Sequence, residues 1–275
     1  MKLEGKVVFV TGSTDGVGRL VAKRLAGAGA RVLVHGRDRS RGERVVAEIR
    51  ADGGSAAFFA ADLSSLAAVR QLSDVVRKAT DRLDVLINNA GIGTGGEGTR
   101  REVSADGHEL RFAVNYLAGF LLTHRLLPLL ERSAPARIIN VASLGQQPID
   151  FEDVMLTRAY DGARAYCQSK LAQIMFTIDL AEQLKGKNVT VNSLHPASYM
   201  NTRMVRQAGV TPWSTVEEGA EAIIHLATSP ALAKTTGWFF NGMNPAHPNA
   251  QAEDPKARQR LRELTLKLTA PTDRP

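Results

Sequence analysis

Short apolar segments alternate along the whole chain with longer segments of helical periodicity, and this alternation restricts the fold more than any other feature. The short segments are apolar on both sides, so both faces of the strands they form must be buried. Strands of this kind, separated by helices, form a parallel sheet covered on both faces. The predicted strands are 6–11, 31–35, 56–60, 84–87, 137–142, 188–194 and 237–241.

The predicted helices fill the intervals between these strands. They span 17–28, 41–52, a segment capped by Ser64 or Ser65 that runs to about 81, then 106–131, 163–184, 216–228 and a tail at 254–268. No change in composition divides the chain, so residues 1–275 are predicted to form a single domain. Two loops that follow strands, at about 144–160 and 197–215, are expected to contact the substrate.

Composition and charge argue against several classes of protein. The net charge is +7, but the basic residues are scattered apart from a cluster at 37–44, and no aromatic residues interleave with that cluster. We therefore expect no nucleic-acid partner. Cys167 is the only cysteine, which fits a cytoplasmic protein. The sequence shows no room for a signal peptide and no run of about 20 unbroken apolar residues, so no membrane is expected either.

The basic tail at 254–268 allows one exception to that expectation. Its leucines lie near arginines, so it could attach to a membrane surface. A helix docked on the protein's own core is the favoured interpretation.

A glycine-rich turn, T-G-S-T-D-G-V-G at 11–18, joins the first strand to the first helix. Glycines let the backbone turn tightly and let a pyrophosphate approach, while the helix N-terminus offers free N–H groups and a partial positive charge. A merely structural turn is the alternative, but the strand–turn–helix context favours a nucleotide. The residues expected to bind it are Gly12, Ser13, Thr14, Asp15, Gly16, Val17 and Gly18.

The second strand is followed by Gly36 and Arg37. An acidic residue at this point would bind the adenosine ribose of NAD, whereas a guanidinium matches a phosphate. Arg37 therefore predicts NADP(H) in preference to NAD(H). A solvent-exposed surface arginine is the alternative; Arg39 and Arg41 favour the anion site, and Asp38 opposes it.

Tyr166 and Lys170 lie four residues apart in the predicted helix 163–184, so they share one helix face. A free tyrosine has a pKa of about 10, and a neighbouring ammonium lowers it. A phenol adjusted in this way can exchange a proton with a carbonyl or alcohol oxygen. For the pair alone, a surface tyrosine beside a solvated lysine is the alternative.

Two further polar residues support the catalytic interpretation. Ser143 follows the strand 137–142, so it is expected at the same edge of the sheet as the glycine turn, where its hydroxyl can bind a substrate oxygen. Asn115 lies within the apolar segment 106–131 and needs a hydrogen-bond partner. A satisfied core amide is the alternative for Asn115.

In this order and spacing, these residues resemble the short-chain dehydrogenases/reductases over about residues 6–268. The matching motifs are T-G-x-x-x-G-x-G at 11–18, Asp62-Leu63, N-N-A-G at 88–91, Asn115, Ser143, Tyr166-x-x-x-Lys170 and His195-Pro196. The resemblance implies an α/β, three-layer Rossmann fold. Its sheet would have seven parallel strands in the order 3-2-1-4-5-6-7, with helices on both faces.

The resemblance also implies a role for each site residue. Tyr166 would be the acid/base, Ser143 would hold the substrate oxygen, Lys170 would lower the tyrosine pKa and bind the nicotinamide ribose, and Asn115 would hold a proton-relay water. No residue is assigned to a metal. Further contacts to the cofactor are expected from Asp62, Leu63, Asn89, Ala90, Gly91 and Pro196, and from Tyr199 because the loop after Pro196 departs from the family pattern.

A narrower resemblance is to the retinol-dehydrogenase-like branch, through the segments 106–109, 114–117 and 165–170 and the helical tail. That branch prefers apolar alcohols and carbonyls. We expect an NADP(H)-dependent enzyme that reduces a lipophilic ketone or aldehyde and reversibly oxidises the alcohol. A non-enzymatic NADP(H)-binding sensor on the same fold is the alternative. The two long helices form subunit contacts in relatives, so a homodimer or homotetramer is expected.

Overall fold

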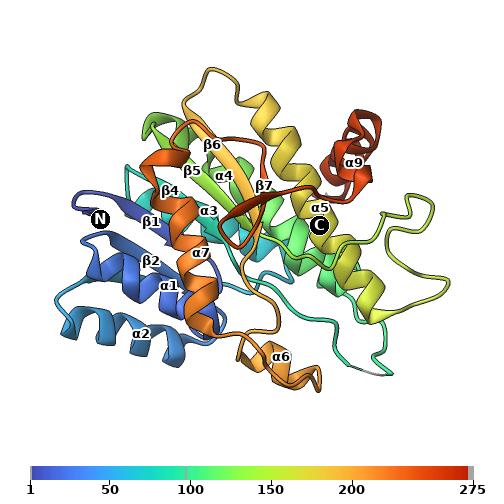
Figure 1. Ribbon diagram of the computed structural model, residues 1–275, viewed down its shortest axis with the longest axis horizontal. Helices are drawn as coiled ribbons and strands as arrows, with labels where there is room; N and C mark the ends of the chain where they lie inside the picture. Colours follow the sequence, from blue (N-terminus) through green and yellow to red (C-terminus); the bar gives the residue numbers. More distant parts are fainter. Residues whose placement is uncertain (1, 97, 272–275) are drawn as a thin grey trace.

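An eight-stranded sheet forms the centre of the protein in the computed structural model, in the order β3-β2-β1-β4-β5-β6-β7-β8 (Figure 1). The structure describes residues 2–96 and 98–271, so residues 1, 97 and 272–275 of the predicted domain lie outside this description. The strands are β1 Val7–Val10, β2 Arg31–Gly36, β3 Ser55–Ala60, β4 Val85–Asn88, β5 Ala136–Val141, β6 Val189–His195, β7 Phe239–Asn241 and β8 Asn244–Ala246.

The first seven strands are parallel and follow the predicted order, which confirms the Rossmann-type fold class. The prediction of seven strands is one short, because β8 adds an antiparallel edge strand beside β7. This strand has only three residues, N-P-A, and its proline suits an edge position. It lacks the apolar pattern by which the other strands were identified.

Helices cover both faces of the sheet and give three layers (Figure 1). The helical segments are α1 Gly16–Gly27, α2 Arg39–Ala51, α3 Leu66–Ala79, η1 Phe112–Leu117, α4 Ala118–Arg132, α5 Gly162–Gln183, α6 Arg203–Gln207, α7 Val216–Thr228, η2 Pro230–Leu232, α8 Ala250–Glu253 and α9 Pro255–Leu268.

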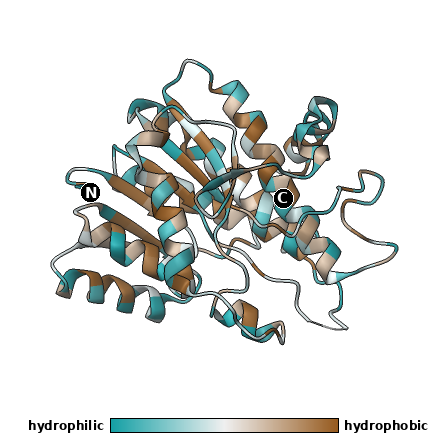
Figure 2. Cartoon of the chain, in the orientation of Figure 1, coloured by the Kyte–Doolittle hydropathy of each residue, from teal (hydrophilic) through white to brown (hydrophobic). Residues whose placement is uncertain are grey.

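Each face of the sheet has its own apolar core, because successive side chains of a strand point to opposite faces. Val8 and Val10 of β1 pack with α1, α2 and α7 on one face. Phe9, between them, packs with α3, α4 and α5 on the other. In Figure 2 the strands are mostly hydrophobic, whereas hydrophilic and hydrophobic residues alternate along α2. This arrangement brings the carboxyl ends of the parallel strands to one edge, where the candidate site lies.

The predicted helix 106–131 begins later than expected, at Leu110. Leu110 and Arg111 lead into the π-helical turn η1, which continues into α4. The Glu109 carboxylate accepts a hydrogen bond from the Phe112 amide at 2.7 Å and so caps this start. Within the described residues, 112–132 is the one helical stretch long and apolar enough to cross a membrane, but 67% of its apolar window is buried inside the protein. Burial of this extent is typical of a core helix.

The C-terminal tail packs on the protein itself, as the favoured interpretation of the sequence predicts. Arg262 of α9 pairs with Asp179 of α5 at 2.5 Å. The hydroxyls of Tyr116 in η1 and Thr265 in α9 are 2.8 Å apart, and Leu261 is 2% exposed. Helix α9 therefore covers part of α5 and η1, two of the elements expected to form subunit contacts.

Candidate active site

The turn between β1 and α1 has a backbone that favours glycine at its key positions. Gly12 has φ +64° and Gly16 has φ +52°, both in the left-handed region. A Cβ on Gly12 would lie 2.8 Å from Cα of Ala90, and a Cβ on Gly18 would lie 2.3 Å from the carbonyl oxygen of Gly12. The bare backbone leaves the helix N-terminus open to a close ligand.

Buried polar side chains hold this turn from beneath. His35 Nδ1 accepts the Gly12 amide at 3.1 Å, and Ser13 Oγ donates to the Val10 carbonyl at 2.7 Å. The Asn89 side-chain amide donates to the carbonyls of Thr11 and Gly12, at 2.9 and 3.1 Å. Asn89, expected along the cofactor, thus also fixes the shape of the turn.

The turn fits the phosphates of a dinucleotide. The Asp15 carboxylate caps α1 by accepting the Gly16 amide at 2.8 Å. Within the described part of the chain, the first-turn amides of Val17 and Gly18 have no acceptor, so they remain available to an anion. Gly91 lies close to two of the predicted catalytic residues, since a Cβ there would lie 3.2 Å from Oδ1 of Asn115 and 3.6 Å from Nζ of Lys170.

Ser143 follows β5 and Tyr166 lies in the first turns of α5, and the structure brings the two side chains together. The buried position of Tyr166 raises the pKa of its hydroxyl, and the hydrogen bond with Ser143 lowers it in part. Ser143 Oγ also accepts the Gly145 amide at 3.0 Å, which fixes its orientation. The pair therefore presents two hydroxyl groups at the carboxyl edge of the sheet.

Lys170 lies behind Tyr166, with Nζ 5.6 Å from the centre of the phenol ring. Its ammonium donates to the Val141 carbonyl at 2.9 Å and to Oε1 of Gln173 at 3.0 Å. Burial lowers the pKa of Lys170 to about 7. The predicted geometry is confirmed, but the predicted lowering of the Tyr166 pKa is not: burial outweighs the stabilisation of the phenolate.

Asn115 lies in the π-helical turn η1, and both ends of its amide are used. Its Oδ1 accepts the Ile92 amide at 2.8 Å, and its Nδ2 donates to the Ile92 carbonyl at 3.1 Å and to Ser169 Oγ at 2.9 Å. Asn115 therefore joins the loop after β4 to α5. π-Turns are frequent at functional sites, and here the turn directs a buried amide toward α5.

The remaining predicted cofactor residues lie around the same edge. Arg37 is 70% exposed, with Nη1 3.9 Å from Oδ2 of Asp62. Leu63, the residue after Asp62, is buried. Pro196 begins the loop after β6. Tyr199 has φ +46° and is 48% exposed.

The structure places one further titratable side chain, His195, beside the predicted site residues. Burial lowers the pKa of His195 to about 4, and the positive charge of Lys170 lowers it further. The His195 ring is therefore neutral at pH 7, and its Nε2 lies 3.0 Å from Ser198 Oγ in the loop after β6. The His195-Pro196 motif marked this position, but its spacing could not reveal the nearness to Lys170.

A buried ion pair supports the rim of the site. Arg111 lies 3.6 Å from the carboxylate of Glu109 and donates to the carbonyls of Gly93 and Thr94, at 2.8 and 2.9 Å. It also donates to the Tyr160 hydroxyl at 2.6 Å. This cluster ties the loops after β4 and β5 together. Nothing in the local sequence indicates it, because Tyr160 lies 51 positions after Glu109 and 49 after Arg111.

The model of the short chain dehydrogenase family matches residues 6–212, which is most of the chain. The chain belongs to this family. Human retinol dehydrogenase 11 is 37% identical over 98% of this chain and 87% of its own length. Human retinol dehydrogenase 13 is also 37% identical, over 94% and 83%. The short-chain dehydrogenase described here is accordingly an oxidoreductase that acts on CH–OH groups with a nicotinamide cofactor, of the retinol-dehydrogenase-like branch.

Solved structures agree with this assignment. A protein from Mycobacterium paratuberculosis superposes with a TM-score of 0.81 at 28% identity, covering 98% of this chain and 94% of its own. The RhlG/NADP active-site complex from Pseudomonas aeruginosa superposes with a TM-score of 0.73 at 32% identity, covering 87% of this chain and 95% of its own. The second structure is described as a complex with NADP.

Proposed function

We propose that this protein is an NADP(H)-dependent oxidoreductase that reduces a lipophilic ketone or aldehyde, and reversibly oxidises the alcohol, with Tyr166 as the general acid/base. The observation that carries the proposal is the contact of Tyr166 with Ser143 in front of the buried Lys170. A non-enzymatic sensor would have no need for these groups to converge.

The chemistry follows from the protonation states of these groups. Because the pKa of Tyr166 is raised, the phenol holds its proton at neutral pH and can donate it from Oη to a carbonyl oxygen. Ser143 holds that oxygen beside the phenol. Since the pKa of Lys170 is about 7, the ammonium that stabilises a phenolate is fully present only below neutral pH. The nicotinamide supplies or accepts the hydride when it is bound.

Exposed apolar side chains around the catalytic residues support a lipophilic substrate. Leu144 is 47% exposed next to Ser143, and Trp213 is 74% exposed with its ring 5.2 Å from that of Tyr199. Isolated exposed apolar residues are common, but a group gathered on the loops of a catalytic edge indicates a binding surface. Relatives named for retinol, an apolar alcohol, support the same substrate class.

The preference for NADP(H) rests on positive charge at the adenosine end. Arg37 replaces the acidic residue that would bind the ribose of NAD, and two solved relatives are described as complexes with NADP. A cytoplasmic location, the absence of a membrane or nucleic-acid partner, and a homodimer or homotetramer stay predictions.

Tyr166→Phe tests the catalytic role. We expect kcat to fall by about 100-fold or more, because the variant lacks the acid/base, while the Kd for NADPH stays within about twofold. Tyr116→Phe is the matched control: it removes a buried hydroxyl whose partner is Thr265, away from the site, and should retain activity. Full activity of Tyr166→Phe with a panel of apolar ketones and aldehydes would overturn the assignment.

A further inference from the structure

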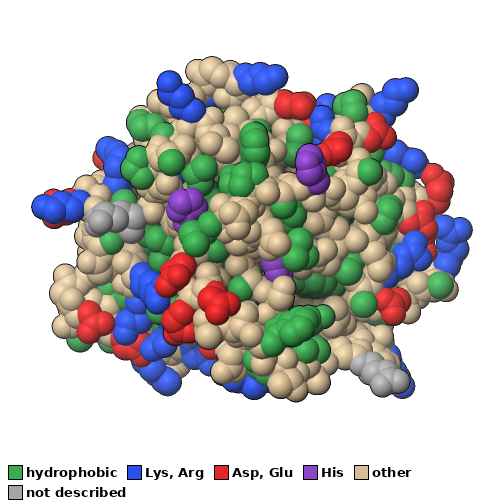
Figure 3. Space-filling model, in the orientation of Figure 1, with side chains coloured by type: hydrophobic (Ala, Val, Ile, Leu, Met, Phe, Trp, Pro, Cys, Tyr) green, Lys and Arg blue, Asp and Glu red, His purple; other side chains and the backbone are tan. Residues whose placement is uncertain are grey.

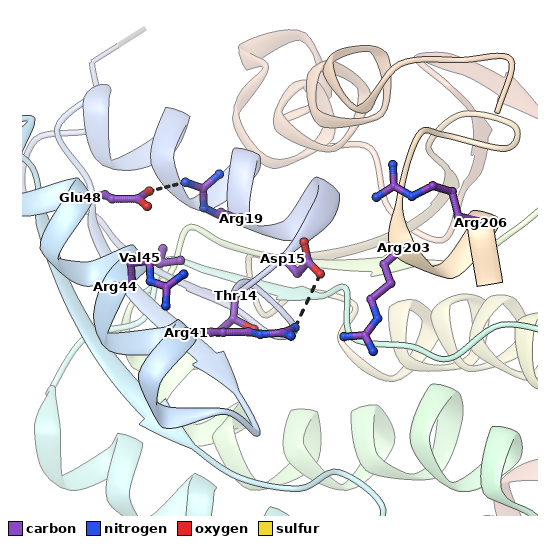
Figure 4. A pocket seen from close by; sticks show the side chains of 9 residues that line it. All are labelled: Thr14, Asp15, Arg19, Arg41, Arg44, Val45, Glu48, Arg203 and Arg206. Atoms are coloured by element: carbon purple, nitrogen blue, oxygen red, sulfur yellow. Dashed lines mark hydrogen bonds and ion pairs between the residues drawn. The ribbon is translucent and has the colours of Figure 1, made fainter.

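A pocket of about 360 Å³ opens on the outer side of the glycine turn, between α1, α2 and α6 (Figure 4). We propose that this pocket binds the 2′-phosphate of NADP(H), and that Arg203 of α6 completes the phosphate site together with Arg41 and Arg44 of α2. The inference rests on the proposed function for its cofactor. Its lining residues are Thr14, Asp15, Arg19, Arg41, Arg44, Val45, Glu48, Arg203 and Arg206.

The pocket has a surplus of positive charge. Five of its lining residues are arginines and two are carboxylates. Arg19 pairs with Glu48, and Arg41 is shared between Asp38 at 3.3 Å and Asp15 at 3.9 Å. Within residues 2–96 and 98–271, Arg44 and Arg203 have no ion-pair partner among the carboxylates.

Guanidinium groups directed into one space repel one another unless an anion lies between them. Figure 4 shows the side chain of Arg203 reaching from α6 toward the guanidinium of Arg41. The planar donor groups of arginine match phosphate oxygens in charge and geometry. A phosphate is therefore the ligand that this pocket fits best.

The position of the pocket indicates which phosphate. Thr14 and Asp15 belong both to the pocket and to the glycine turn. Thr14 also lies against the end of β2, because a Cβ on Gly36 would be 2.5 Å from its Cγ2. The ribose 2′-position of a dinucleotide lies at the end of the second strand. Arg37, by contrast, is not part of the pocket lining and faces Asp62.

Arg203 brings a part of the substrate loop to this phosphate site. Thr202, the N-cap of α6, lies against the glycine turn, since a Cβ on Gly16 would be 3.4 Å from its Cγ2. Met204, the residue after Arg203, packs on the rim of the site, since a Cβ on Gly93 would be 2.9 Å from its Cγ. An occupied phosphate site would therefore fix α6 between cofactor and substrate.

Binding of 2′,5′-ADP and 5′-AMP, measured by titration calorimetry, separates the 2′-phosphate from the 5′-phosphate. We expect wild-type protein to bind 2′,5′-ADP more tightly, and Arg203→Gln and Arg44→Gln each to weaken 2′,5′-ADP by about 10-fold while leaving 5′-AMP within twofold. Arg132→Gln, an exposed arginine at the far end of α4, is the control with the same change in net charge and should alter neither.

The possible outcomes distinguish failure of the pocket assignment from failure of the proposed NADP(H) dependence. Equal weakening of both nucleotides by Arg203→Gln, or no weakening of either, would overturn the assignment of the pocket. If Arg37→Asp abolishes the preference for 2′,5′-ADP and Arg203→Gln does not, the pocket assignment fails and NADP(H) dependence stands. If the wild type shows no preference for 2′,5′-ADP, NADP(H) dependence itself fails.

Hydrogen exchange tests the link to the substrate loop. We expect 2′,5′-ADP to slow amide exchange in 203–207, and 5′-AMP not to, because only the former holds α6 through Arg203. The protection should disappear in Arg203→Gln. Unchanged exchange in α6 of the wild type with saturating 2′,5′-ADP would refute the link.

Discussion

Replacing His35 by asparagine is expected to remove a defined part of the pH dependence of stability. Burial lowers the pKa of His35 to about 4 from its ordinary value of 6.5, and the carbonyl of Ala61 and the charge of Asp62 offset only part of this effect. Asparagine cannot titrate, but its Oδ1 can replace Nδ1 as the acceptor of the Gly12 amide.

The size and sign of the effect follow from proton linkage. Between pH 6.5 and 4 the unfolded chain binds a proton at His35 that the folded chain does not, so stability falls as the pH falls. The difference between the two pKa values corresponds to about 3 kcal/mol of unfolding free energy, fully lost below about pH 4. His195, whose pKa is also lowered to about 4, adds a loss of the same sign that the variant retains.

The assay is urea unfolding at several pH values between 7 and 4 at constant ionic strength. We expect wild-type protein to lose about 3 kcal/mol more than His35→Asn over this interval, whatever constant offset the substitution introduces. His247→Asn is the control, because the His247 side chain is 98% exposed, and it should follow the wild type. Parallel losses in His35→Asn and wild type would refute the reasoning.

Two further predictions concern packing. Gly18→Ala would place a Cβ 2.3 Å from the carbonyl oxygen of Gly12, so the turn must shift, and we expect the Kd for NADPH measured by calorimetry to rise at least about 10-fold. An unchanged Kd would contradict the close approach. Leu261→Ala should lower the free energy of unfolding, measured in urea, by about 2–5 kcal/mol, because this side chain of α9 is only 2% exposed. A loss below about 1 kcal/mol would show that the tail is loosely docked.

The sequence predicts the fold well where one periodicity governs a whole element. The predicted helix 216–228 coincides with α7, and 163–184 differs from α5 by one residue at each end. The start of 106–131 was wrong because residues 106–109 are not helical. The Glu109 side chain caps a start at Leu110 by accepting the Phe112 amide, and its other oxygen contacts Tyr160. Such a contact is invisible to local periodicity.

In the candidate site, too, the features that follow from local sequence patterns were predicted, and those that depend on contacts between distant segments were not. The i, i+4 spacing of Tyr166 and Lys170 and the position of Ser143 after a strand are local patterns, and the structure brings the three together. The predicted direction of the Tyr166 pKa shift was wrong, because that direction depends on how deeply the folded chain buries the phenol. The position of Arg203 beside Arg41 and Arg44 could not be predicted, since it depends on how the short helix α6 lies relative to α2.

The docked tail also limits how two copies of this enzyme can meet. Thr265 reaches Tyr116 and Arg262 reaches Asp179, so a neighbour approaching α5 along this side would encounter α9 first. To contact this side of α5 directly, a second subunit would have to displace α9. That displacement would expose Leu261 and leave the Asp179 carboxylate without Arg262. A homodimer or homotetramer of this chain would therefore incorporate α9 into its contact or assemble through a different surface.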